Sequence, residues 1–405
     1  MRKIFIAVLF IFNICALYAQ DTAEEQKYRR CSLYSLLISH DKATYSDEIE
    51  QVFEMIPVPD KFDNHDLSVK IITSPDRREE EKDITAFLND NKVANRLVAK
   101  WFDRDPETGI CNVDLVKSRG LYDATYFDVE LAKMSQRGFD ILADAGEELI
   151  HNTFVVVNDI RYIDRNKGAR VAGAIIGILA GVASAYVGGS SSDISNAMKI
   201  GEVISEIKGF AVIVTSYLYR LEWNDEIAGE FYSKYYSSVP LDDKALLEQF
   251  YESDAFKLTY VGNQRVKSGN ISMEGVNTYD PIAAIRKVCT RSIDKSIAGL
   301  QRNYDEFKVK TPIFSVEPDI TAKIGLKEGM SETSKYEILE QYTGRDGRTA
   351  YRRVGVIKPV KGKIWDNRYM AIEENAVGAE LEYTTFKVIS GNNFRPGMLI
   401  REIRN

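Results

Sequence analysis

Cysteine is scarce in this chain, which has four cysteines among 405 residues. One of them, Cys15, lies inside an N-terminal apolar run, and the other three are far apart at Cys31, Cys111 and Cys289. Three widely spaced cysteines exclude a disulfide framework of the kind that stabilises small secreted domains. One disulfide plus one thiol is compatible with the count, but we expect three buried thiols, because an unpaired cysteine behaves as a small core residue.

Histidine and the common catalytic motifs are scarce as well. The three histidines have no partner at the spacing of a metal site, and we expect ordinary core or surface roles for His40, His65 and His151. Acidic residues alternate from Asp103 to Glu107, but the position of Gly109 and the lack of a closing glutamate do not fit a calcium loop. The sequence also lacks a phosphate-binding loop and a nucleophile motif. We therefore expect no cofactor and no metal.

An excess of positive charge is also missing. The formal net charge is −7 at pH 7, and loss of Arg2 and Lys3 with a cleaved signal would make it −9. Because an acidic chain is a poor binder of nucleic acid, we expect no nucleic-acid partner. The length and the apolar content of 44% are enough for two or three domains, each with its own core.

The first nineteen residues have the pattern of a secretory signal. A charged start precedes an apolar core, and Ala19 stands before a cleavage position at Gln20. The apolar run is short for a membrane anchor, and Cys15 lacks the small-residue surroundings of a lipoprotein signal. We expect cleavage of residues 1–19, no lipid on Cys15, and export to the periplasm or to the outer membrane.

The most distinctive stretch runs from Val171 to Gly189, where small residues recur at every fourth position and no charge occurs. On a helix this spacing places the small residues on one narrow face, which lets another helix approach closely. A second helical pattern follows from about Asp193 to Ile207. The predicted helix-contact positions of this glycine zipper are Gly173, Gly177, Gly181, Ala185, Gly189, Ala197 and Gly201.

Two β-rich runs flank this helical pair, from Thr153 to Ile163 and from Phe210 to Trp223. We expect neighbouring strands of one sheet, with a helical hairpin inserted between them at about residues 168–209. Two interpretations of the hairpin are open. It packs on protein, or it contacts a membrane through residues 171–187, a helix of roughly 25 Å that is short for a bilayer core of about 30 Å.

Helical patterns precede and follow these strands. One spans Ile84 to Trp101, with apolar residues at helical spacing. Another begins at Asp280-Pro281, where an N-cap residue precedes a proline at the first helical position. This second pattern carries an apolar seam from Ile282 to Leu300, which predicts a long helix packed on a core.

The pattern changes near Lys310, after which short β runs alternate with turn residues. The turn signal Gly344-Arg-Asp-Gly347 predicts a hairpin. A region of this length and pattern favours a small β-barrel, SH3-like or OB-like, over residues 310–405. The predicted strands are Tyr336–Glu340, Tyr351–Val360, Lys363–Trp365, Thr384–Ile389 and Met398–Ile403.

The order of a helix ending at Ile150, the two flanking strands and a further helix resembles the anticodon-binding-like α/β domain of periplasmic assembly proteins. These include the curli secretion channel family and lipoprotein activators of cell-wall synthases. The segments Ile324–Met330 and Phe394–Arg401 are similar to the terminal barrel of the flagellar assembly T protein. The resemblance covers half of the chain and implies assembly work in the cell envelope. The zipper and the absence of a lipobox depart from it, so lipid tethering is not implied.

We therefore expect an α+β fold with two main domains. The first, over residues 20–309, is an α/β domain that carries the hairpin insert, and the second, over residues 310–405, is the small β-barrel. The predicted function is non-enzymatic. The chain would be an exported envelope protein that acts in assembly or as a scaffold, associating with itself, with another envelope protein or with a membrane through the zipper.

Two alternatives come from other residue patterns. Aromatic residues of the barrel could form a platform for a peptide or a glycan, through Tyr336, Tyr342, Tyr351, Trp365 and Tyr369. Two carboxylates, Asp159 and Glu222, could meet across the flanking strands and serve a secreted hydrolase.

Overall fold

The structure of the chain, a computed structural model, describes residues 31–40, 43–73, 80–122, 149–163, 210–268, 276, 281–343 and 349–403. These residues form a mixed α and β fold with two separate sheets. The predicted signal sequence and the predicted hairpin at about 168–209 lie outside the described residues. The coarse prediction of an α+β fold is confirmed.

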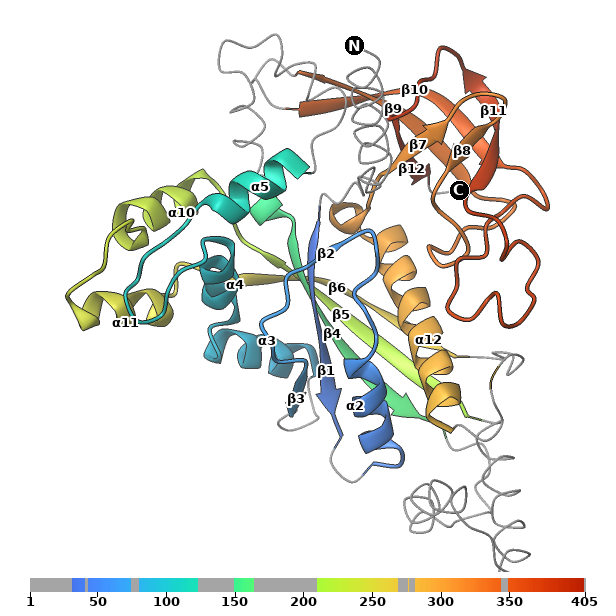
Figure 1. Cartoon of the computed structure of the whole chain (residues 1–405). Helices are drawn as coiled ribbons and strands as arrows, with labels where there is room; N and C mark the ends of the chain where they lie inside the picture. Colours follow the sequence, from blue (N-terminus) through green and yellow to red (C-terminus); the bar gives the residue numbers. More distant parts are fainter. Residues whose placement is uncertain are drawn as a thin grey trace, which may run out of the picture.

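The first sheet contains strands from the N-terminal two-thirds of the chain (Figure 1). Its order is β2-β1-β4-β5-β6, and the short β3 pairs with β1 on the same side as β2. β1 is parallel to β2, β3 and β4, whereas β5 is antiparallel to both β4 and β6. The bounds are β1 Ser32–Ser39, β2 Asp63–Asn64, β3 Ile71–Thr73, β4 Thr153–Tyr162, β5 Val212–Leu221 and β6 Leu258–Lys267.

Helices cover both faces of this sheet, because alternate side chains of its central strands are apolar on both sides. In β4, Phe154 and Val156 point into one cluster, and Val155 and Val157 point into the other. The first cluster lies under α2 (Ser46–Glu54) and α12 (Pro281–Asn303), which lie side by side on this face of the sheet (Figure 1).

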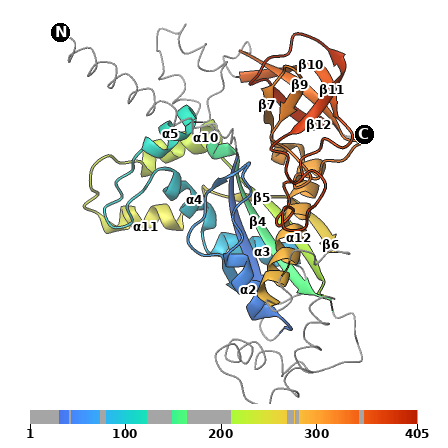
Figure 2. The ribbon, with the colours of Figure 1, turned by 45° about the vertical axis from the view of Figure 1, so that its right-hand side comes forward.

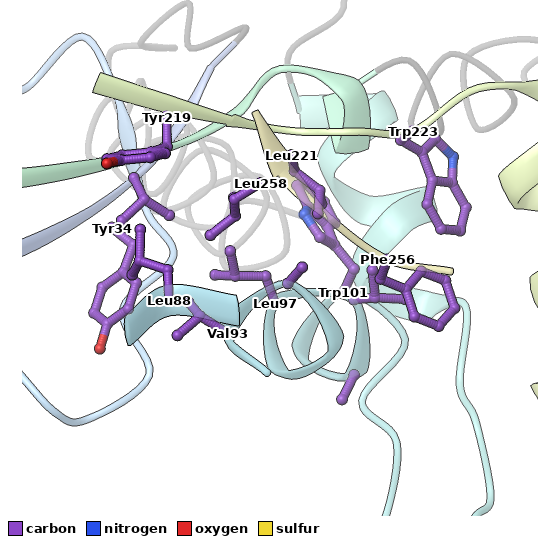
Figure 3. Close-up of a cluster of buried hydrophobic side chains, with 14 of the residues drawn as sticks. Tyr34, Leu88, Val93, Leu97, Trp101, Tyr219, Leu221, Trp223, Phe256 and Leu258 are labelled. Carbon is purple, nitrogen blue, oxygen red and sulfur yellow. The ribbon is translucent and has the colours of Figure 1, made fainter. Parts of the chain in front are cut away.

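The second cluster lies under the other helices. These are α3 (Glu80–Asp90), α4 (Val93–Trp101), α5 (Asp114–Tyr122), α10 (Asp225–Glu230), a π-helical turn (Phe231–Tyr235) and α11 (Lys244–Glu252). Figure 3 shows Trp101 among side chains of this cluster that include Leu221 of β5 and Leu258 of β6. Trp101 is fully buried, and its indole N–H donates to Thr153 Oγ1 at 2.9 Å. Truncation of such a residue typically costs about 3–5 kcal/mol.

The predicted helix from Ile84 to Trp101 is two helices, α3 and α4. The chain turns between them at Asn91 and Lys92, and Lys92 has a left-handed φ of 50°. Because an apolar periodicity continues across the turn, the sequence pattern alone does not reveal the break.

A buried row of polar side chains crosses the centre of the sheet beneath α12. Ser216 Oγ donates to Asn158 Oδ1 at 2.7 Å, and Ser296 Oγ of α12 donates to Ser216 Oγ at 2.7 Å. Asn158 Nδ2 donates to Ser35 Oγ and to the Leu36 carbonyl, each at 3.1 Å. Apolar contacts alone would tolerate small shifts of the strands and of α12, whereas satisfied buried hydrogen bonds of this kind fix their relative positions.

α12 separates the sheet from the second unit (Figure 2). Its predicted apolar seam is confirmed, because Ile285, Val288, Ile293 and Leu300 are buried in the cluster that α12 forms with the sheet. The expected N-cap Asp280 lies outside the described residues. The opposite face of α12 carries charged residues and contacts the C-terminal unit.

The C-terminal unit is a closed barrel of order β10-β11-β8-β7-β12-β9. Four of the five predicted strand runs are strands, whereas Lys363–Trp365 is not, and β7 and β8 have no counterpart in the prediction. Gly355 lies at a β-bulge, where the register of β9 and β10 shifts. The bounds are β7 Thr311–Ser315, β8 Ile320–Ala322, β9 Lys335–Thr343, β10 Thr349–Pro359, β11 Thr384–Gly391 and β12 Leu399–Ile403.

The three cysteines of the described residues, Cys31, Cys111 and Cys289, are buried and form no disulfide, so the expectation of buried thiols is confirmed. Within the described ranges, no helix combines the length and the apolar character that crossing a bilayer requires.

Candidate functional site at the carboxyl end of the first sheet

The carboxyl ends of β1 and β4 lie side by side, because these strands are parallel neighbours with Ile38 opposite Asp159. The chain leaves β1 through α2 on one face of the sheet and reaches β4 through α3 and α4 on the other face. Ligands of open α/β sheets bind outside the carboxyl ends of the strands. This end of the sheet is therefore the candidate site.

Asp159 is held there between a histidine and an arginine. Its Oδ1 lies 2.5 Å from His40 Nε2 and accepts from Arg161 Nε at 3.0 Å. Its Oδ2 lies 2.6 Å from Arg161 Nη2. Burial raises the pKa of Asp159, but the hydrogen bonds from His40 and Arg161 lower it by more, so the pKa lies below its ordinary value. Because both carboxylate oxygens have partners, this Asp159 cluster (His40, Asp159, Arg161) is suited to anchoring and not to nucleophilic attack.

Glu50 of α2 forms a second polar group beside the Asp159 cluster. Its Oε1 accepts hydrogen bonds from Ser39 Oγ at 2.5 Å and from Ser46 Oγ at 3.2 Å. Ser39 ends β1 and Ser46 begins α2. Glu50 therefore ties the end of the strand to the start of the helix that follows it.

A pocket of about 280 Å³ opens at this end of the sheet. Its apolar wall comes from Leu37, Ile49 and Ile160, and its polar lining includes His40, Thr44, Ser46, Glu50, Arg161 and Tyr162. The described residues contain no group of three side chains that could hold a metal ion. The lining suits a small molecule with an apolar body and hydrogen-bonding groups.

Three aromatic rings meet where the chain leaves β4 and enters β5. Tyr162 stacks on Phe210, with ring centroids 5.3 Å apart and planes 25° apart. Tyr45 packs edge-on against both, at 4.8 Å from Tyr162 and 5.3 Å from Phe210. Aromatic contacts of this geometry contribute about 0.5–1.5 kcal/mol each beyond their buried area. This neck stack (Tyr45, Tyr162, Phe210) holds together the two ends of the connection that runs through residues 164–209.

The predicted glycine-zipper positions all lie on that connection, outside the described residues. They are Gly173, Gly177, Gly181, Ala185, Gly189, Ala197 and Gly201. The structure describes the strands on either side, and these are antiparallel neighbours with Tyr162 opposite Val212. The expectation that the flanking strands are adjacent in one sheet is therefore confirmed.

The predicted carboxylate pair is wrong. Asp159 lies opposite Thr215, whereas Glu222 follows the last residue of β5. Seven residues separate positions 215 and 222, which places the two carboxylates roughly 23 Å apart along the strand. Glu222 instead accepts a hydrogen bond from Thr259 Oγ1 on β6. Because β4 and β5 are antiparallel, a residue near the carboxyl end of β4 and one just after the carboxyl end of β5 lie at opposite ends of the strand pair.

The predicted aromatic platform on the barrel is also wrong. Tyr336 is 1% exposed and packs against Phe386 inside the barrel. Tyr342 lies opposite Ala350 and Tyr351 opposite Gln341, so Tyr342 and Tyr351 point to opposite faces of the ribbon. Tyr369 lies against Arg286 of α12. The five aromatic side chains therefore do not share one surface.

His40 and Asp159 were not predicted to form a pair, although both residues have recognisable surroundings. Ser39-His40 follows an apolar strand directly, and Asn158-Asp159 interrupts the run of Val155 to Val157. Polar residues at the end of a buried strand are a signal for a site at the strand ends. The separation of 119 residues hides the contact until the parallel pairing of β1 and β4 is known.

No protein-family model matches this chain, and no curated protein matches it either. No family function can therefore be carried over to the Asp159 cluster or to the neck stack. Their geometry alone supports a functional proposal.

Proposed function

We propose that this chain is a non-enzymatic, exported envelope protein that acts in assembly or as a scaffold. The observation that carries the proposal is the attachment of the zipper segment to the first sheet. Residues 164–209 connect two antiparallel neighbours, β4 and β5, and Tyr162 and Phe210 stack where the segment leaves and returns. A segment fixed at both ends to a sheet, with a face of small residues for close helix contact, is suited to association.

In the proposed architecture, residues 168–209 form a helical hairpin that projects from the carboxyl end of the sheet. The partner is a second copy of the chain or another envelope protein, and contact with a membrane through residues 171–187 is the competing outcome. The barrel would be of the SH3-like or OB-like type. The resemblance to periplasmic assembly proteins supports this proposal at the level of element order.

The alternative of a peptide- or glycan-binding barrel has less support, because its five aromatic residues do not share a surface. A carboxylate-dependent hydrolase also has less support, since Asp159 and Glu222 lie at opposite ends of their strands. The Asp159 cluster anchors the strand ends from which the zipper segment leaves, and this role agrees with a scaffold.

The test is to replace Gly177 by leucine and to measure association of the mature protein. Light scattering measures its size, and flotation with phosphatidylethanolamine–phosphatidylglycerol vesicles measures membrane binding. We expect the wild type to be oligomeric or vesicle-bound, and Gly177→Leu to lose that property without a change in the melting of the first sheet.

Gly229→Leu is the matched control. Gly229 lies in α10, and a Cβ added there meets no atom within 4 Å, so the same chemical change should leave association intact. A wild type that is monomeric and does not float with vesicles would overturn the proposal, as would equal association of Gly177→Leu and wild type.

A further inference from the structure

One face of α12 contacts the barrel unit along its length. Residues on this docking face recur every three or four positions, at Lys287, Arg291, Asp294, Ala298 and Arg302. Lys287 Nζ and Arg291 Nη2 lie 2.5 and 2.7 Å from the carboxylate of Glu374. Arg291 also donates to the Tyr369 carbonyl, and Arg302 donates to the Gly329 carbonyl. Polar contacts therefore join the two units at both ends of the helix.

Asp294 lies in the middle of this docking face. It is 9% exposed, and its Oδ2 has no hydrogen-bond partner. Charged groups from three places act on it. The barrel supplies Lys327 and Glu328, the segment after α2 supplies Asp60, and its own helix supplies Arg291.

Glu328 cannot turn away from this junction without losing hydrogen bonds. Its Oε2 accepts from the Gly325 backbone N–H and from Asn367 Nδ2, each at 2.8 Å. Asn367 Oδ1 in turn accepts from the Lys327 backbone N–H at 2.8 Å. The barrel therefore holds the Glu328 carboxylate in a fixed position, from which its negative charge acts on Asp294. A nearby negative charge disfavours ionisation of the Asp294 carboxyl group.

Glu374, on the barrel side of the same junction, provides a contrast. The side chains of Lys287 and Arg291 donate to it, and these bonds hold its pKa below the ordinary value despite the effect of burial. Asp294 has no such donor on Oδ2, and burial raises its pKa to about 7, with Glu328 and Asp60 acting in the same direction and Lys327 and Arg291 opposing them. At this junction the Glu374 carboxylate is thus ionised, and Asp294 is poised to exchange a proton near neutrality.

We propose that Asp294 makes the docking of the barrel on α12 respond to pH. When Asp294 is protonated, the barrel docks tightly. When it is ionised, a negative charge is buried with no hydrogen bond to Oδ2, the favourable charges of Lys327 and Arg291 do not compensate for its burial, and the barrel separates from the helix more readily. Acidification of the surroundings therefore closes the junction, and neutral pH loosens it.

The direction and the size of the pH effect on docking follow from the linkage between docking and protonation of Asp294. In the undocked state Asp294 is solvated and ionises near its ordinary pKa of 3.8, whereas the docked state retains the proton up to about 7. Between these values docking weakens by about tenfold per pH unit, and above the higher value it stays constant. Between pH 5.5 and 7.5 the expected change in the docking constant is roughly 20-fold.

Hydrogen exchange of the full chain tests the proposal. Protection is measured at pH 5.5 and 7.5 in residues 325–330 and 366–374, each rate being corrected for the intrinsic rate at that pH. We expect about 20-fold stronger protection of the wild type at pH 5.5. Asp294→Asn, which keeps the shape and removes the titration, should show the same protection at both values.

Asp305→Asn is the control, because Asp305 is 75% exposed and lies outside the docking face. It should retain the pH dependence of the wild type. Equal protection of the wild type at pH 5.5 and 7.5 would overturn the proposal even if Asp294→Asn fails to fold. A folded Asp294→Asn that retains the wild-type pH dependence would overturn it as well.

Discussion

Arg104 is a buried charge without a hydrogen-bonding acceptor among the described residues. It is 5% exposed, and its Nε, Nη1 and Nη2 have no hydrogen-bond partner. Its guanidinium lies 4.5 Å from the ring centre of Phe250 and 5.4 Å from that of Tyr251. Cation–π contact contributes about 2 kcal/mol or somewhat more for a desolvated pair, whereas desolvation of a charge costs several kcal/mol.

Replacement of Arg104 by methionine should therefore stabilise the protein. We expect the free energy of unfolding in urea to rise by about 1 kcal/mol, because a flexible apolar side chain fills the site without a charge. Arg352→Met, at a side chain that is 67% exposed in a surface ion pair, should change it by less than about 0.5 kcal/mol. A loss of stability in Arg104→Met would show that the ring contacts outweigh the desolvation.

The burial of a second single residue, His65, predicts that the stability of the protein depends on pH. It is 2% exposed, stacks on Trp101 with centroids 4.8 Å apart, and donates from Nε2 to the Leu97 carbonyl at 3.1 Å. Burial lowers its pKa to about 3. Below pH 6.5 the unfolded chain takes up a proton that the folded chain refuses, so stability falls as the pH drops from 6.5 toward 3.

His65→Gln measures this effect. The variant lacks the titration, so its deficit in unfolding free energy relative to the wild type should shrink by about 2 kcal/mol between pH 7 and pH 5. Urea unfolding of both proteins at the two pH values gives this difference. A deficit that is independent of pH would mean that His65 is not buried as a neutral ring.

At the scale of elements, α12 and the barrel loop that carries Glu374 are joined by a buried ion cluster. The side chains of Lys287, Arg291 and Glu374 are 0%, 6% and 7% exposed. Removal of the Glu374 carboxylate takes away the acceptor that two buried cations share. Glu374→Gln should lower the unfolding free energy by about 3–5 kcal/mol. Asp319→Asn, at an ion pair whose side chains are each 54% exposed, should lower it by less than about 1 kcal/mol.

Elements with strong local signals were predictable from the sequence. The two runs rich in β-branched residues form β4 and β5, and the amphipathic pattern that follows Asp280 forms α12. β7 and β8 were not predictable, because they are five and three residues long and their sides are covered only once the barrel closes. The turn at Lys92 was hidden by an apolar period that continues through it.

At the scale of the whole molecule, the missed contacts are those between residues far apart in sequence. His40 meets Asp159 and Arg291 meets Glu374 only because the strand order and the docking of the barrel bring them together. Composition carries no information on such pairs. The acidic net charge and the lack of catalytic motifs narrow the classes of function that the sequence suggests. The candidate site, in contrast, depends on the order and direction of the strands.

Two titrating groups act in opposite directions on the whole chain. His65 destabilises the fold as pH falls below 6.5, and Asp294 stabilises it as pH falls below about 7. Their contributions to global unfolding therefore offset each other over the mildly acidic range. The unfolding free energy of the wild type could therefore be nearly independent of pH although both groups titrate. The variants His65→Gln and Asp294→Asn each remove one contribution and so reveal the other.

The antiparallel pairing of β4 and β5 makes the segment between them exchangeable. Ile163 N–H donates to the Ala211 carbonyl at 2.7 Å, so the two strand ends are already as close as those of a tight hairpin. Replacement of residues 165–209 by Asn-Gly, a favoured two-residue turn, should leave the melting temperature within about 4 °C of the wild type and abolish association. Circular dichroism and light scattering measure the two effects, and a chain that fails to fold would make the segment part of the core.

If the shortened chain folds, the sheet is a scaffold that does not depend on the segment inserted between β4 and β5. Segments of other lengths and compositions could be grafted at Tyr162 and Phe210 without redesign of the strands, and the same body could then display a different binding element. Variation among proteins built on this plan would be concentrated in that one loop, while the core beneath it changed slowly.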